Sequence, residues 1–193
     1  MKKIITFSYV LLIIYTIYHL VFKYSSLNLL SDIFSMNVDP LILAVFNLLG
    51  MFPLTFLLFA ITTNKLNKVD FIFLFLGFVL GGFAVAPYFI YKKNPKYRNI
   101  RVFKYTSFIL MFTTIIIIIF GLILGNFQVY LNAFLNDSFI HIMTIDFIFM
   151  IFISPLILKP VSRYYLLGFM PIVGIYLNLA LKDYDLKKDK MEV

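Results

Sequence analysis

The stretch that decides the fold class is residues 105–125, which read YTSFILMFTTIIIIIFGLILG and carry no charged side chain. As an α-helix, at about 1.5 Å per residue, this stretch is about 30 Å long, which matches the hydrocarbon core of a bilayer. Lipid offers no hydrogen bonds to backbone N–H and C=O groups, so an apolar stretch of this length must satisfy them within a helix. A strand of a membrane barrel would alternate apolar and polar residues instead. The stretch therefore predicts a transmembrane helix.

Comparable stretches recur along the chain, which is 62% hydrophobic and 13% charged, with a mean hydropathy of +0.97. So few polar residues are atypical of a soluble domain. We predict an all-α, polytopic transmembrane helical bundle of about six helices, each long enough to cross the bilayer. They are expected at about 4–22, 40–61, 71–91, 105–125, 138–158 and 165–181. Residues 1–181 then form a single transmembrane domain, and residues 182–193 form a charged tail.

Two parts of this pattern leave alternatives open. Gly168, Pro171 and Gly174 interrupt the sixth stretch, which is therefore either a full crossing or a re-entrant segment. Residues 24–39 mix polar and apolar side chains in a way that suggests a short interfacial helix. No internal repeat is apparent in the sequence.

The composition also bears on partners and location. The chain has no cysteine, which excludes disulfides, thiol catalysis and thiolate metal sites. Its net charge of +8 is typical of membrane topology and contact with anionic lipid rather than nucleic-acid binding. The first apolar run, residues 4–22, is too long for a signal-peptide core and no cleavage site follows it. We expect a multi-pass protein of the bacterial plasma membrane whose partners are membrane lipids and other membrane proteins.

The orientation stays open at this point. If all six stretches cross, Lys and Arg divide almost equally between the two sides. The cluster over residues 92–104 favours a cytoplasmic position for that loop, whereas Lys2 and Lys3 favour a cytoplasmic N-terminus, on the other side.

Asp146 is the strongest candidate for a functional side chain. It lies about eight residues into the fifth predicted helix, about 12 Å below the interface. A charge at that depth costs about 3 kcal/mol, so the carboxyl should face protein or water and should have a partner. Protonation is another way to lower the cost, because desolvation disfavours the charged form. The functional interpretation is a proton- or ligand-binding group, and the structural one is an interhelical hydrogen bond.

The other polar residues within the predicted helices are fewer and weaker candidates. His141 lies about 140° around the helix from Asp146, whereas Asp137 shares its face, so His141 is expected to cap or anchor the helix end. With six crossings, His19 is expected near the opposite surface, which argues against a shared haem. Asn47 is expected to approach Asp146, and Asn178 is expected at the depth of His141; both are typical of helix–helix hydrogen bonding.

Two small-residue motifs predict close helix packing. Gly77-x-x-x-Gly81 and Gly121-x-x-x-Gly125 lie at matching depths in the third and fourth predicted helices. Small residues let two backbones approach closely, so we expect these helices to pack there as a hairpin. No motif for nucleotide or phosphate binding is present, and no serine-hydrolase elbow or metalloprotease motif. We expect neither a cofactor nor a metal site.

A family resemblance runs through the same residues. Residues 138–147, SFIHIMTIDF, resemble the F-I-H-x-M-x-x-D-F signature of a membrane-protein family of cyanobacteria and plant plastids. Residues 81–88, GGFAVAPY, resemble its glycine-rich segment, and residues 47–53, NLLGMFP, resemble its second-helix start. The likeness continues through Pro155, Arg163 and the Pro171-x-x-Gly174-x-x-Leu177 pattern, and covers about residues 40–182.

What the resemblance implies is limited, because that family has no established activity. It implies that His141, Asp146 and Arg163 are candidate functional positions. The chain departs from the family in residues 159–162, which read KPVS in place of an Asn-Asp-Met run, and in lacking a long plastid leader. No photosynthetic role is therefore carried over.

Three functions are consistent with the sequence. The first is a non-catalytic membrane protein that binds lipid or assists membrane assembly. The second is a proton-coupled small-molecule transporter that uses Asp146. The third is a membrane enzyme acting on an isoprenoid or lipid, with His141 and Asp146 as acid and base.

Overall fold

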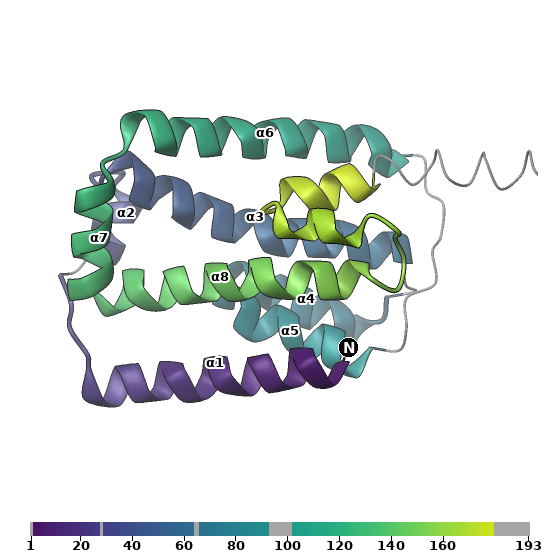
Figure 1. Ribbon diagram of the computed structural model, residues 1–193, viewed down its shortest axis with the longest axis horizontal. Coiled ribbons are helices and arrows are strands. Elements are labelled where there is room, and N and C mark those ends of the chain that lie inside the picture. The colour runs from purple at the N-terminus through teal and green to yellow at the C-terminus, as the bar shows by residue number, and fades with distance from the viewer. Residues whose placement is uncertain (1, 28, 64–65, 93–101, 180–193) are drawn as a thin grey trace, which may run out of the picture.

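Every element in the described part of the chain is helical (Figure 1), which confirms the predicted all-α class. The computed structural model describes residues 2–27, 29–63, 66–92 and 102–179. Its elements are α1 (Lys2–Phe22), α2 (Leu29–Phe34), α3 (Pro40–Thr63), α4 (Lys68–Leu80), α5 (Gly82–Tyr91), α6 (Val102–Leu124), α7 (Phe127–Asn136), α8 (Ser138–Leu158), the 3₁₀ helix η1 (Tyr165–Phe169) and a helical turn over residues 173–179. Four of them, rather than the predicted six, are long and apolar enough to cross a membrane: α1, α3, α6 and α8.

The long helices run side by side between two ends of the bundle (Figure 1). At one end, called the basic end, the ammonium of Lys2 at the start of α1 donates to the carbonyl of Lys92 after α5. At the other end, called the α7 end, Ser25 after α1 exchanges hydrogen bonds with Ser138 at the start of α8. The carboxylate of Asp39 before α3 accepts from the N–H of Asn126 after α6 there, at 3.0–3.1 Å. Consecutive long helices are therefore antiparallel.

Residues 71–91, predicted as one crossing helix, form a helical hairpin instead. The break is at Gly81, whose φ of 56° lies in the left-handed region that favours glycine. Asp70 at the start of α4 accepts hydrogen bonds from Tyr91 and Lys92 at the end of α5, so both legs of the hairpin lie at the basic end. With 13 residues, α4 reaches only about 20 Å, part of the way along the bundle. We call α4 and α5 the first hairpin.

Residues 165–181 also do not form the single helix that was one of the two predicted alternatives. The chain turns back after η1 at Ile172, whose φ is 62°, and then forms the helical turn over residues 173–179. Residues 180–181 and the predicted tail over 182–193 lie outside the described residues. We call residues 165–179 the second hairpin; it packs against α8 (Figure 1).

The two hairpins reveal an internal repeat that was not apparent in the sequence. The order long helix, short helix, long helix, hairpin occurs first as α1 to α5 and again from α6 to residue 179. Residues 76–82, LGFVLGG, and 167–173, LGFMPIV, start with the same tripeptide, and the positive-φ residues Gly81 and Ile172 follow it at the same spacing. The repeat was missed because only this tripeptide is shared.

The packing of the long helices follows the same repeat. From one side of the bundle to the other their order is α6, α3, α8, α1 (Figure 1). In the outer helices α1 and α6, 17% of the apolar window is buried, against 50% in the inner helices α3 and α8. The contacts of α1 with α8 match those of α6 with α3, and the contacts of α2 with α8 match those of α7 with α3. The two halves thus share an element order and an arrangement with one outer and one inner long helix each.

The connections over residues 24–39 and 126–137 each contain a short helix. The segment over residues 24–39 contains α2, which confirms the short helix predicted there. The segment over residues 126–137, which lies between two predicted helices, contains the helix α7. Asn126 begins that helix as its N-cap, since its side-chain oxygen accepts from the N–H groups of Gln128 and Val129.

Candidate functional site

Asp146 lies at the turn of the first hairpin. Its side chain, from the inner helix α8, is 2% exposed, and both carboxylate oxygens accept from the backbone N–H of Gly82, at 3.1 and 3.0 Å. Gly82 is the first residue of α5, and the N-terminus of a helix carries partial positive charge that favours an anion. The sequence predicted that this buried carboxyl has a partner. In the structure, that partner is a backbone N–H at a helix break and not another side chain.

The glycines of this turn are required by the carboxyl group. A Cβ on Gly81 would lie 2.0 Å from one Asp146 oxygen, and a Cβ on Gly82 would lie 2.4 Å from the other. Real Cβ atoms do not approach an oxygen so closely. Gly81 and Gly82 therefore serve two purposes, since they permit the left-handed turn and let α8 bring a carboxyl against the backbone. The Gly81 of the predicted packing motif thus contacts a side chain rather than a second glycine.

Asn47 does not approach Asp146, so that expectation is wrong. Its side chain is exposed, and its amide donates to the carbonyl of Leu43 one turn earlier, at 2.9 Å. The residue of α3 that lies near the turn is Leu49, whose Cδ1 would lie 3.7 Å from a Cβ on Gly81. An apolar contact thus replaces the expected amide.

The two histidines stack on each other at the α7 end, which contradicts the expected placement at opposite surfaces. The ring centroids of His19 and His141 are 4.1 Å apart, with an interplanar angle of 13°. The error followed from counting residues 71–91 as a crossing. Because the first hairpin returns to the basic end, the end of α1 and the start of α8 lie at the same end.

His141 anchors three elements, which agrees with its expected role at the helix end. Its Nδ1 is 2.9 Å from the carbonyl oxygen of Phe134 in α7, and its Nε2 is 2.6 Å from the hydroxyl of Tyr15 in α1. A carbonyl only accepts, so Nδ1 carries a hydrogen and donates it to Phe134. His19 completes the cluster through Ser138, at 3.1 Å from its Nε2.

Asp137, which shares a face with His141, has a separate role as the N-cap of α8. One oxygen accepts from the N–H of Ile140 at 3.0 Å, and the other accepts from the N–H of Leu27 at 2.8 Å. In the described part of the chain, no group of three or more His, Cys, Asp or Glu side chains is placed to hold a metal ion.

A charged cluster closes the first hairpin at the basic end. Asn67 and Asp70 form a capping box at the start of α4, each side chain accepting from the other's N–H at 2.8 Å. Burial raises the pKa of the Asp70 carboxyl, but the hydrogen bonds from Lys92, Tyr91 and Asn67 outweigh it and hold that pKa below its usual value. Burial and the hydrogen bond to Asp70 raise the pKa of Tyr91 to about 12, so its hydroxyl stays protonated and donates.

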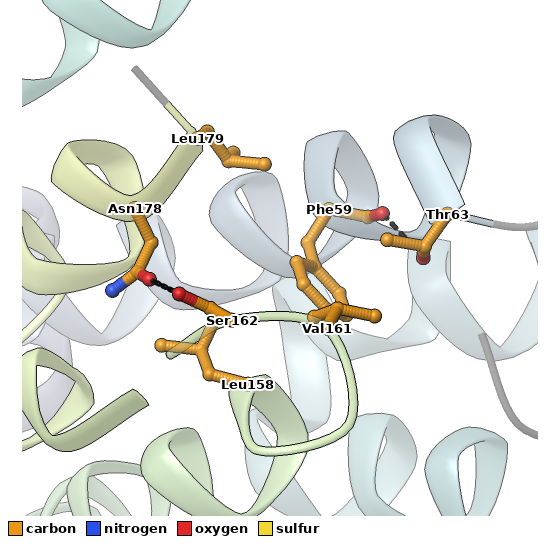
Figure 2. Close-up of a pocket in the computed structure, with 7 residues that line it drawn as sticks. All are labelled: Phe59, Thr63, Leu158, Val161, Ser162, Asn178 and Leu179. Atoms are coloured by element: carbon orange, nitrogen blue, oxygen red, sulfur yellow. Dashed lines mark hydrogen bonds between the residues drawn. The ribbon is translucent and has the colours of Figure 1, made fainter. Parts of the chain in front are cut away.

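Asn178 closes the second hairpin at the basic end rather than lying at the depth of His141. Its amide donates to the carbonyls of Gly174 and Tyr164 at 2.9 and 3.1 Å, and its oxygen accepts from Ser162. Figure 2 shows this pair beside a small hollow. The hollow is lined by residues from α3, α8 and the second hairpin: Phe59, Thr63, Leu158, Val161, Ser162, Asn178 and Leu179. Arg163, implied by the resemblance, is exposed at this end.

The two glycine motifs do not pack against each other. A Cβ on Gly77 would meet Val85 of α5 and Pro53 of α3, at 2.5 and 3.2 Å. Cβ atoms on Gly121 and Gly125 would meet Ala44 and Leu41 of α3, at 2.4 and 2.5 Å. Close packing was expected, but the assumed third crossing gave the wrong partners.

Several residues of these clusters were missed in the sequence. Asp70 follows Asn67 at the spacing of a capping box, which is a recognisable helix-start signal. Tyr15 precedes His19 by four residues, so the two share a helix face. Gly82 had no such signal, because its role depends on a carboxyl group distant in sequence.

No family model matches the chain, and neither a curated protein nor a solved structure matches it. The resemblance to the cyanobacterial and plastid family stays a prediction.

Proposed function

We propose that this chain is an integral, multi-pass protein of the bacterial plasma membrane. In this proposal α1, α3, α6 and α8 cross the bilayer, and the two hairpins are re-entrant from the basic end. Support comes from the outer helices, whose outward faces are apolar and exposed. On α1 these include Phe7 and Phe22, at 65% and 71% exposed, and on α6 they include Ile109 and Ile123, at 67% and 72%. Exposed apolar surfaces of this kind are suited to contact with lipid acyl chains.

The four-crossing arrangement also gives an orientation. Lys2, Lys3, Lys68, Lys92, Lys159 and Arg163 are the described cations of the basic end. Among the cations that the structure describes, the one at the α7 end is Lys23. The connection from α5 to α6, which starts and finishes at the basic end, is itself rich in Lys and Arg in sequence. The positive-inside rule then places the basic end in the cytoplasm.

We further propose a non-catalytic role in which the bundle binds lipid or assists other membrane proteins through its outer faces. The observation that carries this proposal is that buried or half-buried polar side chains join elements of the bundle. Asp146 joins α8 to the first hairpin, His141 joins α8 to α1 and α7, and Asn178 closes the second hairpin. Each has the role of an interhelical hydrogen bond in a membrane protein.

Complementation of a deletion strain tests this role. If these polar side chains are structural, His141→Gln and Asp146→Asn should restore the wild-type phenotype to the deletion strain whenever the variants accumulate normally in the membrane fraction. Loss of function at normal abundance would instead favour a role in transport or chemistry for that side chain. Loss of complementation at normal abundance in a variant with a charge on the outer face, such as Ile109→Lys, would add support.

A proton-coupled transporter is the second candidate, and one observation favours it. Both oxygens of the Asp146 carboxylate share one N–H donor at a helix break inside the bundle. Transporter sites are commonly built at such broken helices near the bilayer midplane. Uptake into vesicles that depends on a proton gradient and is lost in Asp146→Asn, at unchanged abundance, would support this candidate. Uptake unaffected by that change would contradict it.

The enzyme hypothesis gains no support from the geometry. His141 uses both ring nitrogens for Tyr15 and Phe134, and Asp146 is bonded to Gly82. Within the described residues, the hollow of Figure 2 lies at the basic end, and neither His141 nor Asp146 lines it.

A further inference from the structure

The carboxyl group of Asp146 is poorly compensated for its surroundings. It is 2% exposed, and the single N–H of Gly82 serves both of its oxygens. A carboxylate offers about four acceptor sites, and among the described residues its donor is the Gly82 N–H. The ion pair recorded for the described residues joins Lys92 to Asp70, at the basic end, and does not involve Asp146. A charge held in this way is costly unless something neutralises it.

The second hairpin makes a comparable turn without an acid. It turns at the same spacing after the same Leu-Gly-Phe tripeptide, with Ile172 in the place of Gly81 and Val173 in the place of Gly82. Ile172 is fully buried, at 0% exposure, so the second turn is filled by an apolar side chain. A hairpin of this repeat can therefore form with no carboxyl group at its turn. The acid of the first hairpin is therefore not a general requirement of this turn.

The space around the carboxyl group limits what it can bind. The sites of Cβ atoms on Gly81 and Gly82 lie within 2.0 and 2.4 Å of its oxygens, and Phe149 lies 2.9 Å from the latter site. A hydrated metal ion or an organic cation would need a cavity, whereas a proton needs none.

We propose that Asp146 is a proton-binding site whose charge controls how firmly the first hairpin is held on α8. The ionised carboxylate accepts the Gly82 N–H at the positive end of α5, which holds the hairpin. When a proton from water adds to one oxygen, an O–H bond forms and the charge is lost, so the group becomes a weaker acceptor and the hairpin is held less firmly. The proposal deepens the second candidate function and rests on the membrane location proposed above.

The neighbouring elements contribute little other titratable chemistry to the turn. From α1, Tyr9 donates its hydroxyl to the carbonyl of Phe83 at 3.1 Å. From α3 the contact is Leu49, and from α8 the contacts beside Asp146 are Phe149 and Met150. Tyr9 is therefore the residue whose replacement by Phe controls for effects of the wider turn.

Infrared spectroscopy of the whole chain in lipid vesicles tests the proton site directly. The C=O stretch of a protonated carboxylic acid is distinct from that of a carboxylate. Titration between about pH 5 and 9, the range that buried carboxyl groups reach, should give an acid band that is absent in Asp146→Asn and retained in Tyr9→Phe and Asp70→Asn. If the wild type and Asp146→Asn give the same bands across this range, the proposal is overturned.

Cysteine labelling tests the link to the hairpin, because the chain has no native cysteine. Ala84→Cys and Ile175→Cys occupy equivalent positions, three residues after the two turns, and both positions are buried. Because only the thiolate reacts and its fraction falls as the pH falls, the measured quantity is the labelling rate at position 84 divided by the rate at position 175. In detergent micelles, this ratio should rise several-fold as the acid band appears, and in Asp146→Asn it should be high at every pH. A ratio that still depends on pH in Asp146→Asn would overturn the coupling. A titrating band without any proton-dependent uptake would support the site and reject only the transporter.

Discussion

The two hairpins make the same turn with different chemistry. In the first, a pair of glycines admits the carboxyl group of Asp146, and the turn contains a polar contact inside the bundle. In the second, the buried side chain of Ile172 occupies the turn despite its left-handed backbone, which is unfavourable for a β-branched residue. The difference teaches that the repeat specifies the architecture, whereas the acid and its two glycines are specific to one half. A feature present in one copy only is the better candidate for function.

The largest effect is expected where the second hairpin packs on backbone atoms. A Cβ on Gly174 would lie 1.6 Å from the carbonyl oxygen of Leu167, and one on Gly168 would lie 2.6 Å from the nitrogen of Pro155. Because backbone cannot move aside, we expect Gly174→Ala and Gly168→Ala each to lower the free energy of unfolding by about 3 kcal/mol. Thermal unfolding in detergent measures this. The control is Gly50→Ala, since nothing lies within 4 Å of that Cβ and its effect should be neutral or stabilising.

The next effect concerns the first hairpin, where the obstacle is a side chain that can be removed. Gly81→Ala should lower the free energy of unfolding by about 2–3 kcal/mol, because the methyl group meets the Asp146 carboxyl and φ is positive. In an Asp146→Ala background the cost should fall to about 1 kcal/mol, which is the backbone term. A double-mutant cycle measures the coupling. Equal costs in both backgrounds would show that Asp146 does not occupy this turn.

A smaller and pH-dependent effect is expected at the base of the first hairpin. Removing the charge in Asp70→Asn should lower the free energy of unfolding by about 1.5–3 kcal/mol at neutral pH. The pKa of Asp70 is lower in the folded protein than in the unfolded chain, so its contribution is complete above the unfolded value of about 4 and is lost as the pH falls. The free energy of unfolding, measured against pH, should therefore decline on acidification, and it should decline less in Asp70→Asn. A contribution of Asp70 to the free energy of unfolding that increased on acidification would contradict this prediction.

The smallest effect is expected at Asn47, the exposed polar residue of α3. Its amide bonds only within its own turn, so Asn47→Leu should change the free energy of unfolding by less than about 0.5 kcal/mol. The same measurement on Asp146→Leu should give a much larger loss. Similar losses in the two variants would mean that polarity, rather than position at the hairpin turn, sets the effect.

Much of the architecture could be predicted from the sequence because it depends on local hydropathy. The predicted ranges 4–22, 40–61, 105–125 and 138–158 match α1, α3, α6 and α8 closely. The third stretch, residues 71–91, was equally apolar, and length alone could not distinguish one crossing from two short legs. Gly81 and Gly82 carried that information, but glycine pairs also occur within straight transmembrane helices.

The error at the third stretch spread to the candidate site because depth was counted from it. It separated His19 from His141 and divided the Lys and Arg residues almost equally, whereas the expected depth of Asn178 was wrong because residues 165–181 turn back and do not cross. Asp146 was identified correctly as a buried acid in need of a partner, since its local surroundings are enough to show this. Its partner, a backbone N–H, has no signature in sequence.

The number of crossings is the central claim, and labelling of single cysteines in intact cells tests it most directly. Tyr24, Gln128 and Tyr164 are exposed positions in segments after α1, after α6 and after α8. With four crossings and a cytoplasmic basic end, a membrane-impermeant maleimide should label Tyr24→Cys and Gln128→Cys from outside, and should reach Tyr164→Cys only after the cells are opened. Labelling of Tyr24→Cys and Tyr164→Cys from the same side, with Gln128→Cys on the other, would show that residues 71–91 cross the membrane and would contradict the account.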